Sequence, residues 1–281
     1  MMTFLAMIIA VVLLQVWGSA SRVHHDEWFA RLRSQVTELG MSAEINALIS
    51  LAVPVLAALF VLSVFEPILM GLGWIATAIL LLLYAFGRGD FGLLMDRYRG
   101  YCQSGDLEAA YLYVSSELQL VPAAEPLQSV AQEQIQMRRE LLYEGYQRWF
   151  AVLFYFVLLG PAGALAYRLT QLYGRSTNMK AIERLLFYVD WVPVRLLTIA
   201  FSITGDFVAS KDALIASLQN TQDEAGYVLY EVGSAALGLG PVGKEAVEGG
   251  VEAAQIKALG SLLSRSAATW VALISLVVFV S

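Results

Sequence analysis

Long apolar runs alternate with polar segments along the chain, and the two clearest runs are neighbours. Residues 46–65 and 68–86 are almost entirely apolar and are joined at Glu66-Pro67. A helix needs about 20 apolar residues to cross the hydrocarbon core of a membrane. Because Pro67 cannot continue a helix, the pattern predicts a transmembrane hairpin over residues 46–86.

Both ends of the chain are also apolar. Residues 1–20 predict a first membrane helix, because no Lys or Arg precedes the apolar run as it would in a signal peptide. Cleavage of a signal peptide within the small residues 18–21 remains the alternative. Residues 266–281 predict a C-terminal membrane helix, whereas residues 21–45 have the two-sided pattern of an amphipathic helix at the membrane interface.

The central region 149–205 is apolar, but each of its halves is interrupted. Gly160-Pro161 divides the first half, and Pro193 lies inside the second. Basic residues favour the cytoplasmic side of a membrane, and several of them follow Gly160-Pro161 closely. Two arrangements remain open: both halves cross the membrane, or both are broken or re-entrant segments that line a protein-walled pocket. The charges favour the broken arrangement.

The polar segments 87–148 and 206–265 show helical spacing and no strand pattern. The first of them carries six arginines, so we expect it in the cytoplasm, with the tip of the hairpin outside. The fold predicted from these patterns is all-α. It is a polytopic helical membrane protein with cytoplasmic helical segments and a broken or re-entrant central pair.

Composition narrows the functional classes. Of the 281 residues, 58% are hydrophobic and 15% are charged, against about 25% charged residues in typical soluble domains. We therefore do not expect an ordinary soluble enzyme. Because 18 Lys and Arg face 24 Asp and Glu, there is no basic stripe for a nucleic acid. The single cysteine, Cys102, excludes an internal disulfide, and the adjacent His24 and His25 do not share a helix face, so we expect no metal site.

Asp190 and Arg195 are ionisable residues inside an apolar run, where insertion costs about 2.5–3.5 kcal/mol each. Two interpretations are open. In the first, Asp190 caps a helix that begins near Pro193, and Arg195 reaches the lipid headgroups. In the second, both residues line a pocket together with Arg168.

A glycine-rich stretch at residues 238–245 partly matches a phosphate-binding loop, with Gly243 and Lys244 as its weak candidates. Glu245 stands where such a loop has Ser or Thr to hold Mg²⁺, and its carboxylate would repel phosphate. We therefore expect no cofactor, and ATP with Mg²⁺ is only a remote alternative.

Residues 190–196 (Asp-Trp-Val-Pro-Val-Arg-Leu) and residues 160–168 (Gly-Pro-Ala-Gly-Ala-Leu-Ala-Tyr-Arg) resemble the AmpE family of bacterial inner-membrane proteins. The resemblance covers nearly the whole chain. It implies a multi-pass protein of the bacterial inner (cytoplasmic) membrane that acts as a signalling modulator in the regulation of chromosomal β-lactamase. It implies a pathway linked to cell-wall recycling, and it does not imply a reaction.

Residues 100–245 are also distantly similar to the membrane synthases of the CbiB type, which join an aminopropanol unit to cobyric acid. The acidic Glu-Asn-x-x-Asp-Gly signature of those synthases is replaced here by Tyr-Glu-Gly-Tyr-Gln-Arg at residues 143–148. We therefore do not expect the synthase reaction. Whether the chain is an enzyme stays open, with a membrane-embedded transferase or amide-forming synthase as the alternative to a regulator.

The leading hypothesis is a regulatory or sensor protein that binds an anionic small molecule, such as a cell-wall fragment, in a membrane-proximal pocket. Guanidinium groups suit such a ligand because they bind carboxylate or phosphate through two hydrogen bonds. The expected partners are the lipid bilayer and this ligand, and a homo-oligomer or a scaffold that binds proteins through residues 87–148 is also conceivable. The pocket residues that we expect are Glu144, Arg148, Tyr167, Arg168, Gln171, Asp190 and Arg195.

Overall fold

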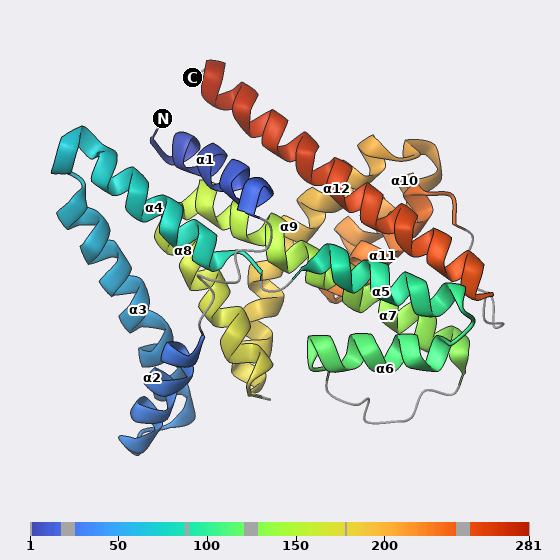
Figure 1. The fold of residues 1–281 in the computed structure, drawn as a ribbon, viewed down its shortest axis with the longest axis horizontal. Helices are drawn as coiled ribbons and strands as arrows, with labels where there is room; N and C mark the ends of the chain where they lie inside the picture. The colour runs from blue at the N-terminus through green and yellow to red at the C-terminus, as the bar shows by residue number, and fades with distance from the viewer. Residues whose placement is uncertain are drawn as a thin grey trace. The chain divides into compact units, whose positions relative to one another are not determined.

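The computed structural model describes residues 2–17, 26–87, 90–120, 129–177, 179–239 and 248–280 (Figure 1). Throughout these ranges the regular elements are helices, and no strand occurs in them. The chain divides into two compact units. Unit 1 comprises Met1–Gly89, Arg148–Val189 and Val278–Ser281, and unit 2 comprises Asp90–Gln147 and Asp190–Val277.

Four of the described helices are long and apolar enough to cross a membrane. They are Ala43–Phe65, Val130–Arg175, Lys180–Thr204 and Gly249–Leu276, and two shorter apolar helices cover Met2–Leu14 and Leu72–Ala85. The prediction of an all-helical membrane protein is thus confirmed.

Unit 1 is built around α8, against which α1, α3 and α4 pack, while α2 packs on α3. The bounds of its elements are α1 (Met2–Trp17), α2 (Glu27–Glu38), α3 (Ala43–Phe65), η1 (Ile68–Gly71), α4 (Leu72–Ala85) and α8 (Ala151–Arg175). A cluster of aromatic and aliphatic side chains forms part of its core: Phe29, Ala47, Ala58, Leu165, Leu169, Tyr173 and Ile182.

The second half of the predicted hairpin is shorter than expected. Residues 68–86 divide into the 3-10 turn η1 and the 14-residue helix α4. Met70 and Gly71 both have a left-handed backbone, with φ of 57° and 94°, so the helix can begin only after them. At 1.5 Å per residue α4 is about 21 Å long, less than the roughly 30 Å of a hydrocarbon core.

The predicted interruption at Gly160 is present. Gly160 has φ 75° and ψ −169° within α8, a conformation that is essentially restricted to glycine. The two parts of α8 therefore join at a kink, and the glycine permits it.

The second predicted interruption is wrong. Helix α9 (Lys180–Thr204) runs without a break through Pro193. A proline removes the hydrogen bond to the carbonyl four residues earlier, which here is the carbonyl of Val189. The Tyr155 hydroxyl donates to that carbonyl at 2.7 Å, so the helix continues with its freed acceptor satisfied.

Unit 2 contains α5, α6, α7, α10, α11 and most of α12, together with the second half of α9. The bounds are α5 (Phe91–Gln103), α6 (Leu107–Leu118), α7 (Val130–Gly145), α10 (Phe207–Gln219), α11 (Ala225–Ala236) and α12 (Gly249–Val280), and the π-helical turn η2 (Tyr146–Phe150) follows α7. Its core includes Leu94, Tyr98, Cys102, Ala110, Val114, Leu118, Met137, Leu141, Ala253 and Ile256.

The sequence predicts a polar segment that ends at residue 265 and a separate membrane helix that begins at residue 266. In the structure α12 crosses this boundary as a single helix of 32 residues. Its buried positions Glu252, Ile256, Leu259, Leu263 and Ser266 recur at alternating spacings of four and three, the spacing that places side chains in one seam against neighbouring helices.

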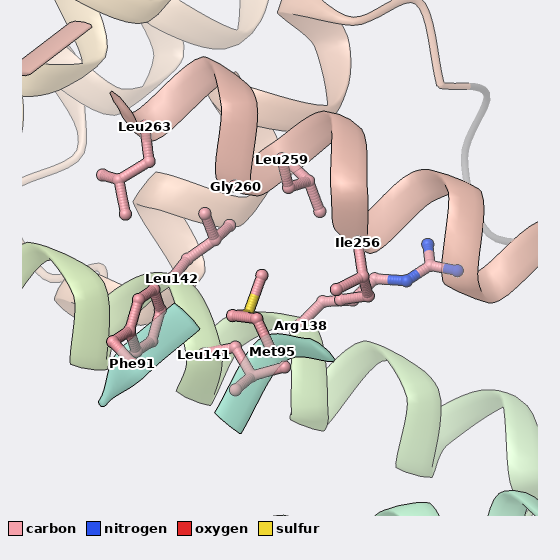
Figure 2. A pocket seen from close by; sticks show the side chains of 9 residues that line it. All are labelled: Phe91, Met95, Arg138, Leu141, Leu142, Ile256, Leu259, Gly260 and Leu263. Atoms are coloured by element: carbon pink, nitrogen blue, oxygen red, sulfur yellow. The ribbon is translucent and has the colours of Figure 1, made fainter. Parts of the chain in front are cut away.

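The seam of α12 faces α5 and α7, as Figure 2 shows. A cavity of about 10 Å³ remains there, room for about one water molecule at most. Apart from Arg138, its lining is apolar: Phe91, Met95, Leu141, Leu142, Ile256, Leu259, Gly260 and Leu263. The cavity is therefore a packing defect rather than a ligand site.

The start of α12 offers a matched pair of glycines. A Cβ at Gly249 would overlap the backbone carbonyl oxygen of Cys102, whereas a Cβ at Gly250 would meet open space. We expect Gly249→Ala to lower the free energy of unfolding by about 1–3 kcal/mol, because backbone must move. Gly250→Ala is expected to leave it unchanged or to raise it slightly, because alanine favours helix. Thermal unfolding of both purified variants checks this, and equal stabilities would contradict the contact.

Candidate functional site

A buried ion pair joins α7 to α12 within unit 2. Arg138 is 1% exposed and Glu252 is fully buried. The Nε of Arg138 donates to the two carboxylate oxygens of Glu252 at 3.2 and 3.1 Å, and its Nη2 donates to Oε2. The hydroxyl of Tyr98, on α5, also donates to Oε1 at 3.2 Å. The geometry satisfies both carboxylate oxygens, which a buried ion pair requires to offset its desolvation.

The same carboxylate affects its neighbours on α5. Burial, followed by the negative charge of Glu252, raises the pKa of the Cys102 thiol to about 11. The same two causes raise the pKa of Tyr98 far above its usual range. Cys102 is buried among the core side chains of unit 2.

Asp190 forms a second polar centre of unit 2. Its side chain is 1% exposed. The hydroxyl of Tyr143 donates to Oδ2 at 2.6 Å and that of Tyr146 donates to Oδ1 at 2.9 Å. The two tyrosine rings stack, with centroids 6.0 Å apart and planes inclined by 18°. Phenol donors on both oxygens stabilise a carboxylate in a site that water does not reach.

The capping interpretation of Asp190 is therefore wrong. Asp190 lies inside α9, which begins at Lys180, and its partners are side chains of another helix rather than backbone N–H groups. Prediction from the sequence named Asp190 but missed Tyr143 and Tyr146. Their spacing of three residues, which places both on one face of a helix, was the available signal.

Arg195 donates to backbone carbonyls, and its expected place in a pocket with Arg168 stays a prediction. Its Nη2 donates to the Asn220 carbonyl at 3.1 Å and its Nε to the Ser217 carbonyl at 3.3 Å. Both carbonyls lie at the C-terminal end of α10, where a cation is favourable. The guanidinium carbon also lies 4.6 Å from the centroid of the Trp191 ring. At 4% exposed, Arg195 does not extend to headgroups; it closes the end of α10.

Four of the predicted pocket residues belong to unit 1. Arg168 and Gln171 are buried on α8, and Arg168 donates to the Gln171 side-chain oxygen. Tyr167 is buried beside them and stacks on Tyr155, with centroids 5.3 Å apart. Arg148 is buried in η2, where its carbonyl accepts from the Gly87 N–H at 3.3 Å.

The remaining predicted residues divide between unit 2 and the part of the chain without a described structure. Glu144 is buried on α7 in unit 2, as are Asp190 and Arg195. Gly243 and Lys244, and likewise His24 and His25, lie outside the described residues.

A cation–aromatic cluster of unit 2 was not predicted. The guanidinium carbon of Arg139 lies 4.8 Å from the ring centroid of Tyr227 and 5.7 Å from that of Tyr230. The charge of Glu231 is the main cause that raises the pKa of Tyr227. Because acidic and basic groups are mixed here, this face has no single preference for anions.

The family model described as "Regulatory signalling modulator protein AmpE" matches residues 2–277. The chain belongs to the AmpE family. This match confirms the resemblance found in the sequence, and it assigns to the chain the general role of a regulatory signalling modulator. Comparison of this AmpE-family chain with curated proteins and with solved structures gave no match.

Proposed function

We propose that this AmpE-family protein resides in the bacterial inner membrane and modulates the induction of chromosomal β-lactamase in response to a small anionic molecule, such as a fragment of the cell wall. Its family membership supports the regulatory role, and its four long apolar helices support the membrane location. The buried ionisable side chains support the response to an anionic molecule.

The observation that carries the proposal is the burial of ionisable side chains inside helices that are apolar enough to cross a membrane. Arg168 in unit 1 and Asp190 in unit 2 are both buried, and each is hydrogen-bonded to polar side chains. Ionisable residues at membrane depth are costly and commonly mark ligand sites or signal pathways. Their burial supports a role for both residues beyond filling a core.

Arg168 is the arginine that we assign to the ligand. Arg195 already donates to two carbonyls at the end of α10. Arg168 instead donates to the side-chain oxygen of Gln171, a neutral amide. A carboxylate or phosphate that replaced the amide would gain a charge-assisted hydrogen bond.

Arg168→Gln tests this assignment. We expect cells that carry this variant in place of the natural protein to lose the effect of the protein on induced β-lactamase activity, because an uncharged side chain cannot pair with the anion. Arg175→Gln, an exposed arginine on the same helix, is the matched control and is expected to act as the natural protein does. Equal amounts of both variants in the membrane fraction, measured by immunoblot, exclude a folding defect.

If Arg168→Gln retained the full effect at a normal membrane level, the assignment of the ligand to Arg168 would be overturned. The regulatory role would stand in that case, because it rests on family membership.

A further inference from the structure

Helix α10 of unit 2 exposes large apolar side chains while two of the three residues on its buried face are serines. The face that packs in the protein carries Ser210, Leu214 and Ser217, all of which are buried. The face that points away carries large apolar side chains, including Phe207, which is 55% exposed, and Val208, which is 84% exposed. A protein in water does not gain stability by this arrangement, since the transfer of such side chains out of water is favourable.

The outward apolar side chains form one continuous stripe. Phe207, Ile215 and Leu218 are exposed and recur at intervals of eight and three residues, which place them on one side of a helix. Val208 lies seven residues before Ile215 and therefore on the same side. The exposed polar residues Asp212 and Gln219 border this stripe, whereas the exposed residues Ala209 and Ala216 lie on the side of the helix that faces away from it.

The position of α10 in the chain indicates what covers the stripe. Helix α9, which is long and apolar enough to cross a membrane, ends at Thr204, and only Gly205 and Asp206 separate it from α10. A chain of four residues extends at most about 14 Å, so Val208 lies no farther than that from the end of α9.

The turn between these helices is also held in place. Asp206 caps α10 by accepting a hydrogen bond from the Ala209 N–H at 3.0 Å, and its own N–H donates to the Ala236 carbonyl at 2.7 Å. A Cβ at Gly205 would clash with that same carbonyl. The start of α10 is thus fixed close to the end of α9, where the membrane surface must lie if α9 spans.

The charge on the stripe fits a lipid surface. Lys211 lies between Phe207 and Ile215 at four-residue intervals and is exposed. A lysine within an apolar stripe buries its aliphatic stem and extends its ammonium group to the phosphate level. Large apolar residues on one side of a short helix, with a basic residue among them and polar residues on the other side, are typical of a helix that lies in the membrane interface.

We propose that α10 (Phe207–Gln219; orange in Figure 1) is an interfacial membrane helix, with Phe207, Val208, Ile215 and Leu218 embedded at the boundary between headgroups and acyl chains and with Lys211 at the phosphates. The segment 206–265, which the sequence predicts to be polar, therefore begins with a helix that binds lipid. This proposal does not depend on the regulatory role of the protein.

Site-directed spin labelling of the full chain tests the proposal. Single cysteines at positions 208 and 215 place nitroxides on the stripe, and cysteines at the exposed positions 209 and 216 are the matched controls on the other side of the same helix. The natural Cys102 is buried and its pKa is raised to about 11, so it is expected to remain unlabelled, and the unsubstituted protein measures that background. The protein is reconstituted in vesicles of phosphatidylethanolamine and phosphatidylglycerol.

The readout is the collision of each nitroxide with oxygen, which partitions into lipid, and with a water-soluble nickel complex. We expect labels at 208 and 215 to favour oxygen and labels at 209 and 216 to favour nickel, so that the depth parameter changes sign between the two faces. Nickel access at 208 and 215 equal to that at 209 and 216 would overturn the proposal. Shielding of 208 and 215 from both reagents would also overturn it, because a protein partner would then cover the stripe.

Discussion

Replacement of Asp190 with asparagine is expected to reduce strongly, without abolishing it, the proposed effect of this protein on inducible β-lactamase, while the protein still reaches the membrane. Asparagine keeps the shape of the side chain, but its amide nitrogen is a donor and cannot accept the hydrogen bond that one of the two tyrosine hydroxyls makes with the carboxylate. Hydrogen bonds to a charged group contribute about 1.5–3 kcal/mol each. The measurement is β-lactamase activity after induction, in cells without the natural protein.

The control for this substitution is Asp212→Asn, which changes an exposed carboxylate of the same unit. Its effect on β-lactamase is expected to equal that of the natural protein. If Asp190→Asn also retained the full effect at a normal membrane level, the polar centre around Asp190 would be no more than a contact that holds α9 against α7.

Replacement of Arg138 with methionine is expected to lower the free energy of unfolding by about 3–5 kcal/mol, because Glu252 would remain buried without its cation. Methionine fills a similar volume without a charge. The double variant Arg138→Met with Glu252→Leu is expected to recover most of this loss or to exceed the natural stability, since an apolar pair needs no desolvation of charge. Thermal unfolding of the detergent-purified proteins measures both.

An exposed ion pair of the same unit provides the comparison. Arg99 and Asp96 lie 2.8 Å apart on α5, and the Asp96 side chain is 70% exposed. Arg99→Met is expected to change stability by no more than about 1 kcal/mol. A loss as large as that of Arg138→Met, or a double variant as unstable as the single one, would show that the buried pair is not what holds α12.

The local features of the fold could be predicted from the sequence. Apolar runs and the Gly160-Pro161 kink depend on residues that are close in the chain. The continuity of α9 could not be predicted, because it depends on a hydroxyl donated by Tyr155, 34 positions before Val189.

For the same reason, the sequence identified the charged residues of the polar centres but not their partners. Asp190 and Arg195 stand out because they are charged residues in an apolar run. Their partners are a tyrosine 47 positions away and backbone carbonyls 22 and 25 positions away, and neither type of group is unusual in its own segment. Glu252 lies 114 positions from Arg138, in a segment whose charges are typical of an exposed helix.

The central proposal is that buried ionisable residues serve the regulatory response, and a double-mutant cycle at the contact between Tyr143 and Asp190 tests it most directly. Tyr143→Phe, Asp190→Asn and the double variant are compared for β-lactamase activity after induction, each at an equal membrane level. We expect each single variant to reduce the response and the double variant to lose no more than Asp190→Asn alone, because residues that act through one shared contact are not additive. Independent, additive losses would contradict the claim.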